Sequence, residues 1–484
     1  MEILNKLHDV LIVGGGIIGT FIARELSKYD LEVGLIEAKN DVGDGCSGAN
    51  SAIVHSGYDP IPGTLKAKFN VLGNPMWDEI AEELDIHFFR IGSLTVAFED
   101  SQLPILESLA RRAKENGVEV KLLSAVEVKK LEPNINPNVK GALLAPTAGI
   151  VDPFLAVVKA MENAMDNGVK LYLNNRVENI SKEKDIYVIK TSKGEYKSRV
   201  VINAAGVHSG EIASMVEDID WKVIPRKGEY FLLDHFAYGF VNHTIFPLPS
   251  EKGKGVLFTL TTSGNLMFGP SSEEIEDLDD VSTDKLTLDS VKSQALNLIP
   301  NIPMQKVIRV FSGNRPTTTR HDFIIEPAKS DKNFINVAGI ESPGLASAPA
   351  IAKYVVEELI SDTISLKEKN NYISHVRKHP NLYDKGLENR AKFVKNNPEF
   401  GEIICNCEKI SLGEIKDTLS RNVAPTSIKG IKKRCRAGFG SCQGGFCQSR
   451  IIEILADHYN LSPLDVLYDE EGSNVLIDTI METK

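Results

Sequence analysis

Five of the six cysteines in this chain of 484 residues lie close together near its C-terminus. Four of them form two pairs, Cys405-x-Cys407 and Cys442-x₄-Cys447, with 34 residues between the pairs. Four thiolates in two pairs suit a tetrahedral zinc ion or the two irons of a [2Fe–2S] cluster. Zinc sites more often use a Cys-x-x-Cys spacing, and the glycines around the second pair allow backbone amides to approach cluster sulfurs. The spacing therefore favours [2Fe–2S] over zinc, with an empty or disulfide-bonded site as the remaining alternative.

The other two cysteines have different expected roles. Cys435 is a fifth thiol in the same stretch, and we expect it to be a spare thiol near the metal site, or else a substitute for a ligand. Cys46 lies far upstream and is interpreted as a small residue in a loop. The N-terminal apolar run leads directly into glycines with no cleavage site, so it does not predict a signal peptide. Six cysteines in an unexported chain indicate reduced thiols, and the expected compartment is the cytoplasm.

A second chemical pattern, Gly14-x-Gly16-x-x-Gly19, lies in the stretch DVLIVGGGIIGTFIARELSKYDLEVGLIE at residues 9–37. The apolar run before the glycines predicts a buried strand, the residues after them predict a helix, and a second apolar run ends at Glu37. Gly14 permits the tight turn, Gly16 lets the backbone approach a pyrophosphate, and Gly19 permits close packing of helix on strand. Glu37 can accept hydrogen bonds from both hydroxyls of a ribose. The pattern predicts a dinucleotide site for FAD or NAD rather than NADP.

Later strand-and-glycine elements favour FAD over NAD. The loop of small residues that follows the acid includes Asn50 and Ser51, and it is able to wrap the ribityl chain and pyrophosphate of a flavin. VVINAAGVHS predicts a strand that stops at Gly206, and FINVAGIESPGLASAPAIAKYVVEELI predicts a strand, a turn with Gly339 and Gly344, and a long helix. Three separated elements that return to one sheet are what a flavin domain needs when another domain is inserted in it. These five residues are therefore predicted to contact the cofactor.

The segments between the flavin elements have a different pattern. WKVIPRKGEYFLLD at residues 221–234 alternates apolar and polar residues, and GVLFTLTTSGNLMFGP predicts a hairpin that turns at Ser263-Gly264-Asn265. The expected fold class is α/β with an α+β insert: a doubly wound FAD-binding domain, an inserted antiparallel-sheet substrate domain, and a small, mainly helical C-terminal iron–sulfur domain. The predicted boundaries are 1–90, 145–215 and 325–362 for the FAD-binding domain, 91–144 and 216–324 for the substrate domain, 363–400 for a connector, and 401–484 for the [2Fe–2S] domain.

Bulk composition excludes several classes of function. The net charge of −11 disfavours nucleic acid as a partner, because phosphate binding depends on clustered Lys and Arg. No run of about 18 apolar residues occurs, so no direct membrane insertion is expected. With 42% hydrophobic and 25% charged residues, the composition is that of a folded protein with an ample core.

In combination, GGGIIG, NSAIVHSGYDPIPGTLKAK, GIVDP, PRKGEY, SGNRP and AGIESPGLASAPAI resemble the D-amino-acid-oxidase-like superfamily of flavoproteins. Within it, roughly residues 8–362 are similar to FAD-dependent glycerol-3-phosphate dehydrogenases of the anaerobic type and to L-2-hydroxyglutarate oxidases. RAGFGSCQGGFC and the cysteine pairs resemble the bacterioferritin-associated-ferredoxin-like module, which carries a [2Fe–2S] cluster and follows flavin domains in those dehydrogenases. The resemblance implies a flavin at a two-domain interface, with substrate over its ring under the inserted sheet.

The resemblance also implies which residues carry the chemistry. Flavin oxidation of an alcohol needs a base for the hydroxyl proton, and His55 lies in the loop expected to pass the isoalloxazine. A histidine that only binds loop backbone is the alternative, and covalent flavin attachment in this loop is another. Arg315 matches the arginine that contacts substrate phosphate in the family, and Arg320 corresponds to a second, although either could form a surface salt bridge. His321 is a second base candidate, and the helix beginning at Gly344 is implied to point its dipole at the ring.

These implications predict an FAD-dependent dehydrogenase that oxidises sn-glycerol 3-phosphate to dihydroxyacetone phosphate, with hydride passing to FAD and electrons passing singly through the [2Fe–2S] centre to a partner. The alternatives are an L-2-hydroxyglutarate or other 2-hydroxy-acid dehydrogenase, an amino-acid or opine dehydrogenase subunit, and a non-catalytic electron-transfer subunit. Both alcohol substrates are anionic, so the arginines do not separate them. Expected partners are a small anionic substrate and further flavin or iron–sulfur subunits, with no nucleic acid.

Overall fold

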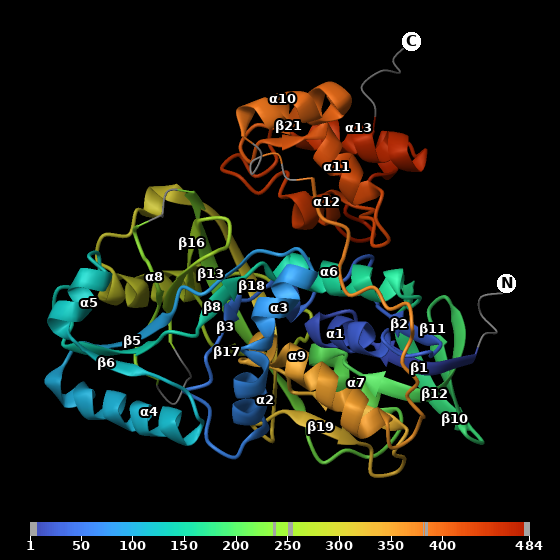
Figure 1. Cartoon of the computed structure of the whole chain (residues 1–484), viewed down its shortest axis with the longest axis horizontal. Helices are drawn as coiled ribbons and strands as arrows, with labels where there is room; N and C mark the ends of the chain where they lie inside the picture. The colour runs from blue at the N-terminus through green and yellow to red at the C-terminus, as the bar shows by residue number, and fades with distance from the viewer. Residues whose placement is uncertain (1–6, 236–238, 250–254, 381, 383–385, 479–484) are drawn as a thin grey trace.

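The computed structural model describes residues 7–235, 239–249, 255–380, 382 and 386–478. Two large β-sheets with helices packed on them are followed by a third, mainly helical unit at the C-terminal end of the chain (Figure 1). None of the helices in these ranges is both long and apolar enough to traverse a bilayer. The predicted domains also include residues outside the description, namely 1–6, 236–238, 250–254, 381, 383–385 and 479–484.

The first sheet has eight strands and carries the predicted dinucleotide pattern. Its elements are β1 (Leu7–Val13), α1 (Ile17–Leu26), β2 (Val33–Ile36), α6 (Pro153–Asp166), β9 (Lys170–Tyr172), β10 (Val177–Glu183), β11 (Ile186–Thr191), β12 (Gly194–Asn203), α7 (Ser209–Ser214), β19 (Ile324–Pro327), β20 (Phe334–Ala338) and α9 (Gly344–Tyr354), which continues as a π-helix at Val355–Ile360. Five strands run parallel in the order β9-β2-β1-β12-β20, and the β10-β11 hairpin and β19 add antiparallel pairs.

Helices cover both faces of this sheet, which explains the continuous apolar runs in its strands. Val10 and Ile12 pack in a core with α1, α6 and α9 on one face, and Leu11 and Val13 pack with α7 and the β10-β11 hairpin on the other. All four side chains are at most 5% exposed. The frame is therefore the doubly wound sheet that the sequence predicted.

The second sheet has nine strands and is the predicted insert. Its strands are β5 (Ser93–Ala97), β6 (Lys121–Ser124), β7 (Gly141–Ala145), β13 (Val223–His235), β14 (Thr244–Phe246), β15 (Leu257–Leu260), β16 (Asn265–Gly269), β17 (Glu273–Glu274) and β18 (Val307–Thr318), and α4 (Leu103–Glu115), α5 (Ala125–Leu131) and α8 (Lys285–Leu298) pack on them. Every neighbouring pair is antiparallel except β14 with β5. β15 and β16 form the hairpin predicted around Gly264.

Short elements join the two sheets. They are β3 (Ile53–Val54), α2 (Leu65–Gly73), α3 (Met76–Glu83), β4 (Phe88–Phe89) and β8 (Gly149–Val151), of which β3, β8 and β4 form a small sheet of their own. The described segments 93–145 and 223–318 thus supply the second sheet, and the flanking segments supply the first. We propose the predicted domain boundaries on the basis of this separation.

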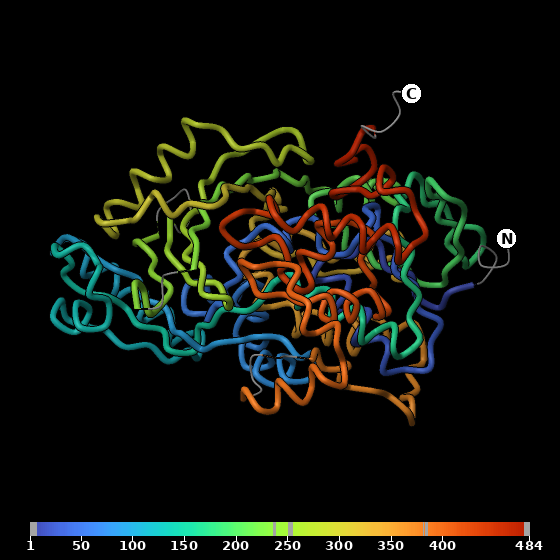
Figure 2. Tube along the Cα trace, turned by 90° about the horizontal axis from the view of Figure 1, so that it is seen from above, coloured from blue at the N-terminus to red at the C-terminus, as the bar shows by residue number. Residues whose placement is uncertain are grey.

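The C-terminal unit, residues 401–478, has an apolar core of its own. It contains β21 (Ile403–Cys405), β22 (Ile410–Ser411), α11 (Leu412–Leu419), α12 (Ile428–Cys435) and α13 (Gln448–Tyr459), and α10 (Leu387–Asn396) precedes it. We refer to this unit as the module. Figures 1 and 2 show it seated over the first sheet on the side of α6, with the second sheet extending toward the other end of the molecule. Residues of α12 contact α6 directly.

Candidate functional site

The turn after β1 brings the three predicted glycines and Glu37 together. Gly14 has a φ of +109°, and a Cβ there would collide with the carbonyl oxygen of Ala204, so only glycine fits. A Cβ at Gly19 would collide in the same way with the carbonyl oxygen of Gly14. The Glu37 carboxylate accepts hydrogen bonds from the backbone nitrogens of Gly15 (2.6 Å) and Lys39 (2.8 Å). Burial raises the pKa of Glu37, and these two donors oppose the rise.

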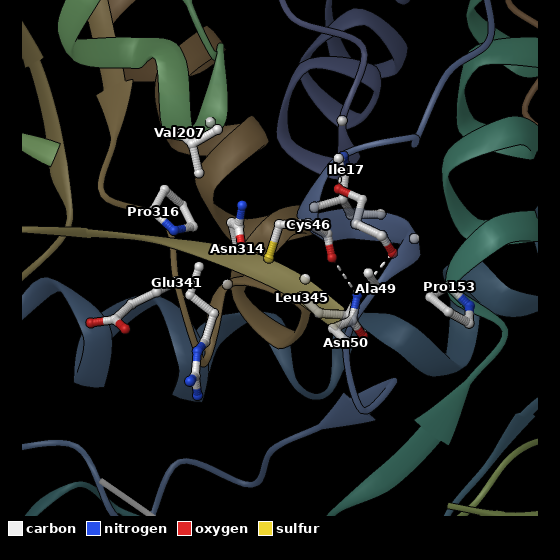
Figure 3. Close-up of a pocket in the computed structure, with 18 of the residues that line it drawn as sticks. Ile17, Cys46, Ala49, Asn50, Pro153, Val207, Asn314, Pro316, Glu341 and Leu345 are labelled. Atoms are coloured by element: carbon white, nitrogen blue, oxygen red, sulfur yellow. Dashed lines mark hydrogen bonds between the residues drawn. The ribbon is translucent and has the colours of Figure 1, made fainter. Parts of the chain in front are cut away.

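The loop after β2 is held by its own side chains. The Asn50 amide nitrogen donates to the carbonyl oxygens of Cys46 (3.0 Å) and Ser47 (2.8 Å), and its oxygen accepts from the backbone nitrogen of Ala52 (2.7 Å). Ser47 Oγ accepts from the Ile17 backbone nitrogen at the start of α1 (2.9 Å). The side chain of Asn50 therefore shapes the loop from within. In Figure 3 this loop lies against Asn314 and Pro316 of β18.

A cavity of about 1730 Å³ connects this loop, the ends of β12 and β20, the second sheet and the module. Its volume is well above the range of about 300–1,000 Å³ that is typical of small-molecule pockets, so it has room for a dinucleotide together with a substrate. Eleven of the predicted site residues line it, and Gly19 lies behind it in the packing of α1 on β1. The eleven are Gly14, Gly16, Glu37, Asn50, Ser51, His55, Gly206, Arg315, His321, Gly339 and Gly344.

Arg315 is positioned on β18 by backbone carbonyl groups. Its Nε donates to the carbonyl oxygen of Arg226 (3.2 Å), and one terminal nitrogen donates to that of Ser271 (2.9 Å). Arg315 forms no ion pair with any residue in the described ranges, so its charge is available to an anion. Tyr230, on the paired strand β13, lies beside it with its hydroxyl hydrogen-bonded to Ser51, and burial raises the pKa of Tyr230 to about 12.

Glu341, a half-buried acid that also lines the cavity, lies close enough to Arg315 for the two charges to interact. One Glu341 oxygen bonds Lys66 Nζ (2.7 Å) and the other accepts from the hydroxyl of Thr317 (2.9 Å). Burial alone would raise the pKa of Glu341, but Lys66 and Thr317 outweigh it and the pKa lies below its ordinary value. Sequence reasoning did not single out Tyr230, Glu341 or Lys66. The signal that could have found them is their place in the PRKGEY, AGIESPG and GTLKAK stretches.

His55 lies at the cavity with its side chain 9% exposed. Its Nε2 is 3.3 Å from Ser342 Oγ, and its ring lies 5.7 Å from that of Phe246. The amides of Asn70 (2.6 Å) and Asn74 (2.9 Å) donate to its backbone carbonyl oxygen, which fixes the backbone of the loop at this point. A buried imidazole oriented by a hydroxyl can exchange a proton with a bound alcohol.

The structure does not bring Arg320 to the cavity. Its guanidinium pairs with the carboxylates of Asp220 and Glu326 on an exposed surface, and it is absent from the cavity lining. Both terminal nitrogens of the Arg320 guanidinium are therefore paired with carboxylates. His321, the next residue, is exposed at the rim with φ +56°, and its carbonyl oxygen accepts from Lys66 Nζ (2.9 Å).

The four predicted ligands converge in two pairs in the module. Cys407 Sγ lies 3.5 Å from Cys442 Sγ, and Cys405 is hydrogen-bonded to Cys447. The Cys447 thiol and nearby backbone N–H groups lower the pKa of Cys405 to about 5, although burial opposes this. Among the described residues, no three His, Cys, Asp or Glu side chains converge as one metal ion requires. Two thiol pairs suit two metal centres better than a single ion.

Cys435 is separate from these pairs. Its Sγ contacts the carbonyl oxygen of Ile431 (3.4 Å) within α12, and burial raises its pKa to about 12. Cys435 is therefore a half-buried residue packed against the core of the module, and its role as a spare thiol stays a prediction. Cys46 is half-buried, desolvation of its thiol raises its pKa to about 11, and it lies in the cavity wall next to Asn314 (Figure 3).

Two family models match the chain. The model described as FAD dependent oxidoreductase matches residues 9–358, and the model described as BFD-like [2Fe-2S] binding domain matches residues 403–457. The chain belongs to the FAD-dependent oxidoreductase family. The predictions of FAD and of a [2Fe–2S] cluster are thereby confirmed, and zinc is not supported.

Relatives of this FAD-dependent oxidoreductase act on related substrates. A glycerol 3-phosphate dehydrogenase from Caloramator mitchellensis is 44% identical over 471 residues, which cover 97% of this chain and 98% of the relative. A glycerol 3-phosphate oxidase from Mycoplasma genitalium is 34% identical and covers 75% of this chain and 97% of its own. The solved structure of L-alpha-glycerophosphate oxidase from Mycoplasma pneumoniae with FAD bound has a TM-score of 0.73 at 31% identity, covering 77% of this chain and 98% of that one.

The residues of the FAD-dependent oxidoreductase fit both FAD and a [2Fe–2S] cluster. Each carboxylate oxygen of Glu37 accepts one backbone bond and keeps a lone pair for a ribose hydroxyl. Gly206 has φ +60° and open space where a Cβ would be, so the backbone can approach a ligand there. At the thiol pairs, the backbone N–H groups of Gly438 and Gly444 point at the sulfurs of Cys405 and Cys442, as cluster sulfurs require.

Proposed function

We propose that this chain is an FAD-dependent dehydrogenase that oxidises sn-glycerol 3-phosphate to dihydroxyacetone phosphate. The observation that carries the proposal is the similarity, along nearly the whole chain and including the module, to a glycerol 3-phosphate dehydrogenase. The cavity supports it, because the guanidinium of Arg315 lies beside the predicted flavin loop and forms no ion pair with any described residue. The 2-hydroxy-acid and amine alternatives, and a purely electron-carrying role, have no comparable support.

The reaction removes a hydride from the carbon and a proton from the oxygen of the secondary alcohol. FAD, when bound, takes up the hydride, and the [2Fe–2S] cluster carries the electrons onward one at a time. Arg315 binds the phosphate, because a guanidinium fork matches phosphate oxygens. His55 takes the hydroxyl proton and Ser342 Oγ, 3.3 Å away, orients its ring. Tyr230 lines the same pocket from β13.

The cofactor assignments within this proposal follow the same geometry. Glu37 would hold the ribose, the start of α1 at Gly16 would face the pyrophosphate, and the loop at Ser51 and the turn at Gly339 would contact the flavin. The pairs Cys405 with Cys447 and Cys407 with Cys442 would hold the cluster. The electron acceptor is a further flavin or iron–sulfur protein.

Anaerobic reduction of the purified holoenzyme tests the proposal. Glycerol 3-phosphate, L-2-hydroxyglutarate, lactate and an opine are mixed separately with the protein, and flavin absorbance is followed. Bleaching by glycerol 3-phosphate alone is expected. Bleaching only by a hydroxy acid or an amine contradicts the substrate, and no bleaching by any of the four contradicts the enzymatic role. In air, low hydrogen peroxide yield distinguishes a dehydrogenase from an oxidase.

A further inference from the structure

The cavity has a second basic group at the end that the module closes. Arg309 on β18, Lys432 on α12 and Arg436 just after α12 all line it. Arg309 lies on the same face of β18 as Arg315, because residues two apart on a strand share a face and the pairing with β13 is regular between them. Six residues of strand separate the two arginines, which is about 20 Å. The second basic group is therefore distinct from the Arg315 site.

The three cations of this group have few anionic partners. Arg309 forms no ion pair within the described ranges. Lys432 is 4% exposed, and its Nζ donates to Gln443 Oε1 (3.2 Å), a neutral partner. Arg436 alone pairs with a carboxylate, that of Glu408 (2.9 Å). Burial, and after it the charges of Arg309 and Arg436, lowers the pKa of Lys432 to about 7, as crowded positive charge does.

We propose that Arg309, Lys432 and Arg436 bind a small dianion of the phosphomonoester class at the module end of the cavity, as substrate enters or product leaves. The inference rests on the proposed function, because it assumes an anionic substrate. The side chain of Arg436 is 25% exposed, so this end of the cavity reaches solvent. Charged clefts with low-dielectric walls raise the local concentration and the association rate of opposite charges, by about 10- to 1,000-fold. The module thus forms part of the substrate path in addition to its cluster.

A bound cluster would add negative charge near these cations besides that of Glu408, since Cys447 and Glu408 both act on Lys432. If these cations served only the cluster, removing one of them would change the reduction potential of the cluster but would not affect the binding of small anions. A substitution of Arg309 distinguishes binding of a small anion from an effect on the cluster, because Arg309 lies on the second sheet and not on the module. Testing the holoenzyme, in which the cluster charge is already present, keeps this distinction clean.

The experiment measures inorganic phosphate binding to the holoenzyme by equilibrium dialysis, together with steady-state kinetics on sn-glycerol 3-phosphate. Arg309→Met is compared with Arg199→Met, a control whose side chain pairs with Asp9 (3.4 Å) outside the cavity. We expect Arg309→Met to lose one of two phosphate-binding events and about tenfold in kcat/KM, with kcat retained and its dependence on salt weakened. Arg199→Met should match the wild type in every measurement.

Two results would overturn the inference. One is phosphate binding and kcat/KM unchanged in Arg309→Met, and the other is a shift in cluster potential as the only effect of that substitution. Failure of the proposed function gives a different result. A holoenzyme that binds phosphate through Arg309 but does not oxidise glycerol 3-phosphate supports the anion site and contradicts the substrate assignment.

Discussion

Asp41, in the loop that follows Glu37, holds the module on the flavin domain through a buried ion pair. Its two carboxylate oxygens accept bonds of 2.8 Å each from the guanidinium of Arg434 on α12, and Lys433 Nζ lies 2.8 Å from the same carboxylate. The side chains of Asp41 and Arg434 are 5% and 2% exposed. In Asp41→Asn the shape is kept, but Arg434 is left buried without a carboxylate.

Removing one partner of a buried pair costs about 3–5 kcal/mol. If the whole of this cost falls on the free energy of docking, the ratio of docked to undocked module decreases by about 150- to 5,000-fold. The connector at residues 363–400 then becomes sensitive to protease, and the rate of cluster reduction by substrate falls while flavin reduction is kept. Limited proteolysis and anaerobic stopped-flow spectroscopy measure the two effects.

A matched control is Asp9→Asn, which removes an exposed pair with Arg199 and should cost less than about 1 kcal/mol. The double variant Asp41→Asn with Arg434→Met removes both charges and should recover part of the protection. If the connector of Asp41→Asn is as protected from protease as that of the wild type, the ion pair does not hold the module. If the double variant is no more protected than the single variant, the loss of docking does not come from an unpaired charge.

The same contacts give docking a pH dependence with a defined sign. Burial alone would raise the pKa of Asp41, but Arg434 and Lys433 hold it well below its usual range. Asp417 on α11 likewise has its pKa lowered to about 2 by His379 of the connector and by Arg421, against burial. Both folded pKa values are depressed, so the stabilisation is complete above the unfolded pKa of about 4 and is lost as pH falls toward 2. Protease protection should therefore persist at neutral pH and decline below about pH 4.

Other substitutions test the remaining assignments. Arg315→Met should lower kcat/KM for glycerol 3-phosphate by about 30- to 1,000-fold, because truncating a charge-assisted contact costs about 2–4 kcal/mol. Arg320 lies outside the cavity, so kcat/KM of Arg320→Met should stay within about threefold of the wild type. Equal losses for the two variants in steady-state assays would refute the assignment of Arg315. His55→Asn should lower kcat by about 100- to 10,000-fold if His55 is the base, and a wild-type rate would exclude that role. Cys442→Ser should abolish the cluster's visible absorbance while Cys435→Ser retains it, since Cys435 is apart from the thiol pairs; loss of absorbance in Cys435→Ser would make it a ligand.

Local patterns in the sequence predicted the features that depend on short stretches of chain. The turn at Gly14 needs a residue with positive φ and no Cβ, and that requirement is visible in the glycine spacing. The number and spacing of the cysteines indicated the two pairs that begin at Cys405 and Cys442. The apolar runs separated by a patterned insert predicted a doubly wound frame with an inserted sheet. FAD and the cluster could therefore be predicted before any contact was known.

Contacts between distant segments could not be predicted in this way. Arg320 pairs with Asp220, 100 residues earlier, and nothing local distinguishes that arginine from Arg315. Tyr230 meets Ser51 only because the second sheet folds over the nucleotide loop, and Lys66 meets Glu341 only because α2 packs against α9. Which polar side chain faces a cavity depends on strand register and domain packing, and a single sequence does not determine these.

The basic run IKGIKKRCR at residues 428–436 shows how packing decides the meaning of a charge pattern. Taken alone, such a run suggests contact with a polyanion. In the fold, Lys433 and Arg434 pair instead with Asp41 and Asp44 of the flavin domain, and the run becomes a docking surface. Because those two acids belong to the loop that lines the cavity, the contacts that seat the module also shape the nucleotide loop. Loosening the module should therefore weaken FAD retention as well as electron transfer, which a module attached only by its connector would not do.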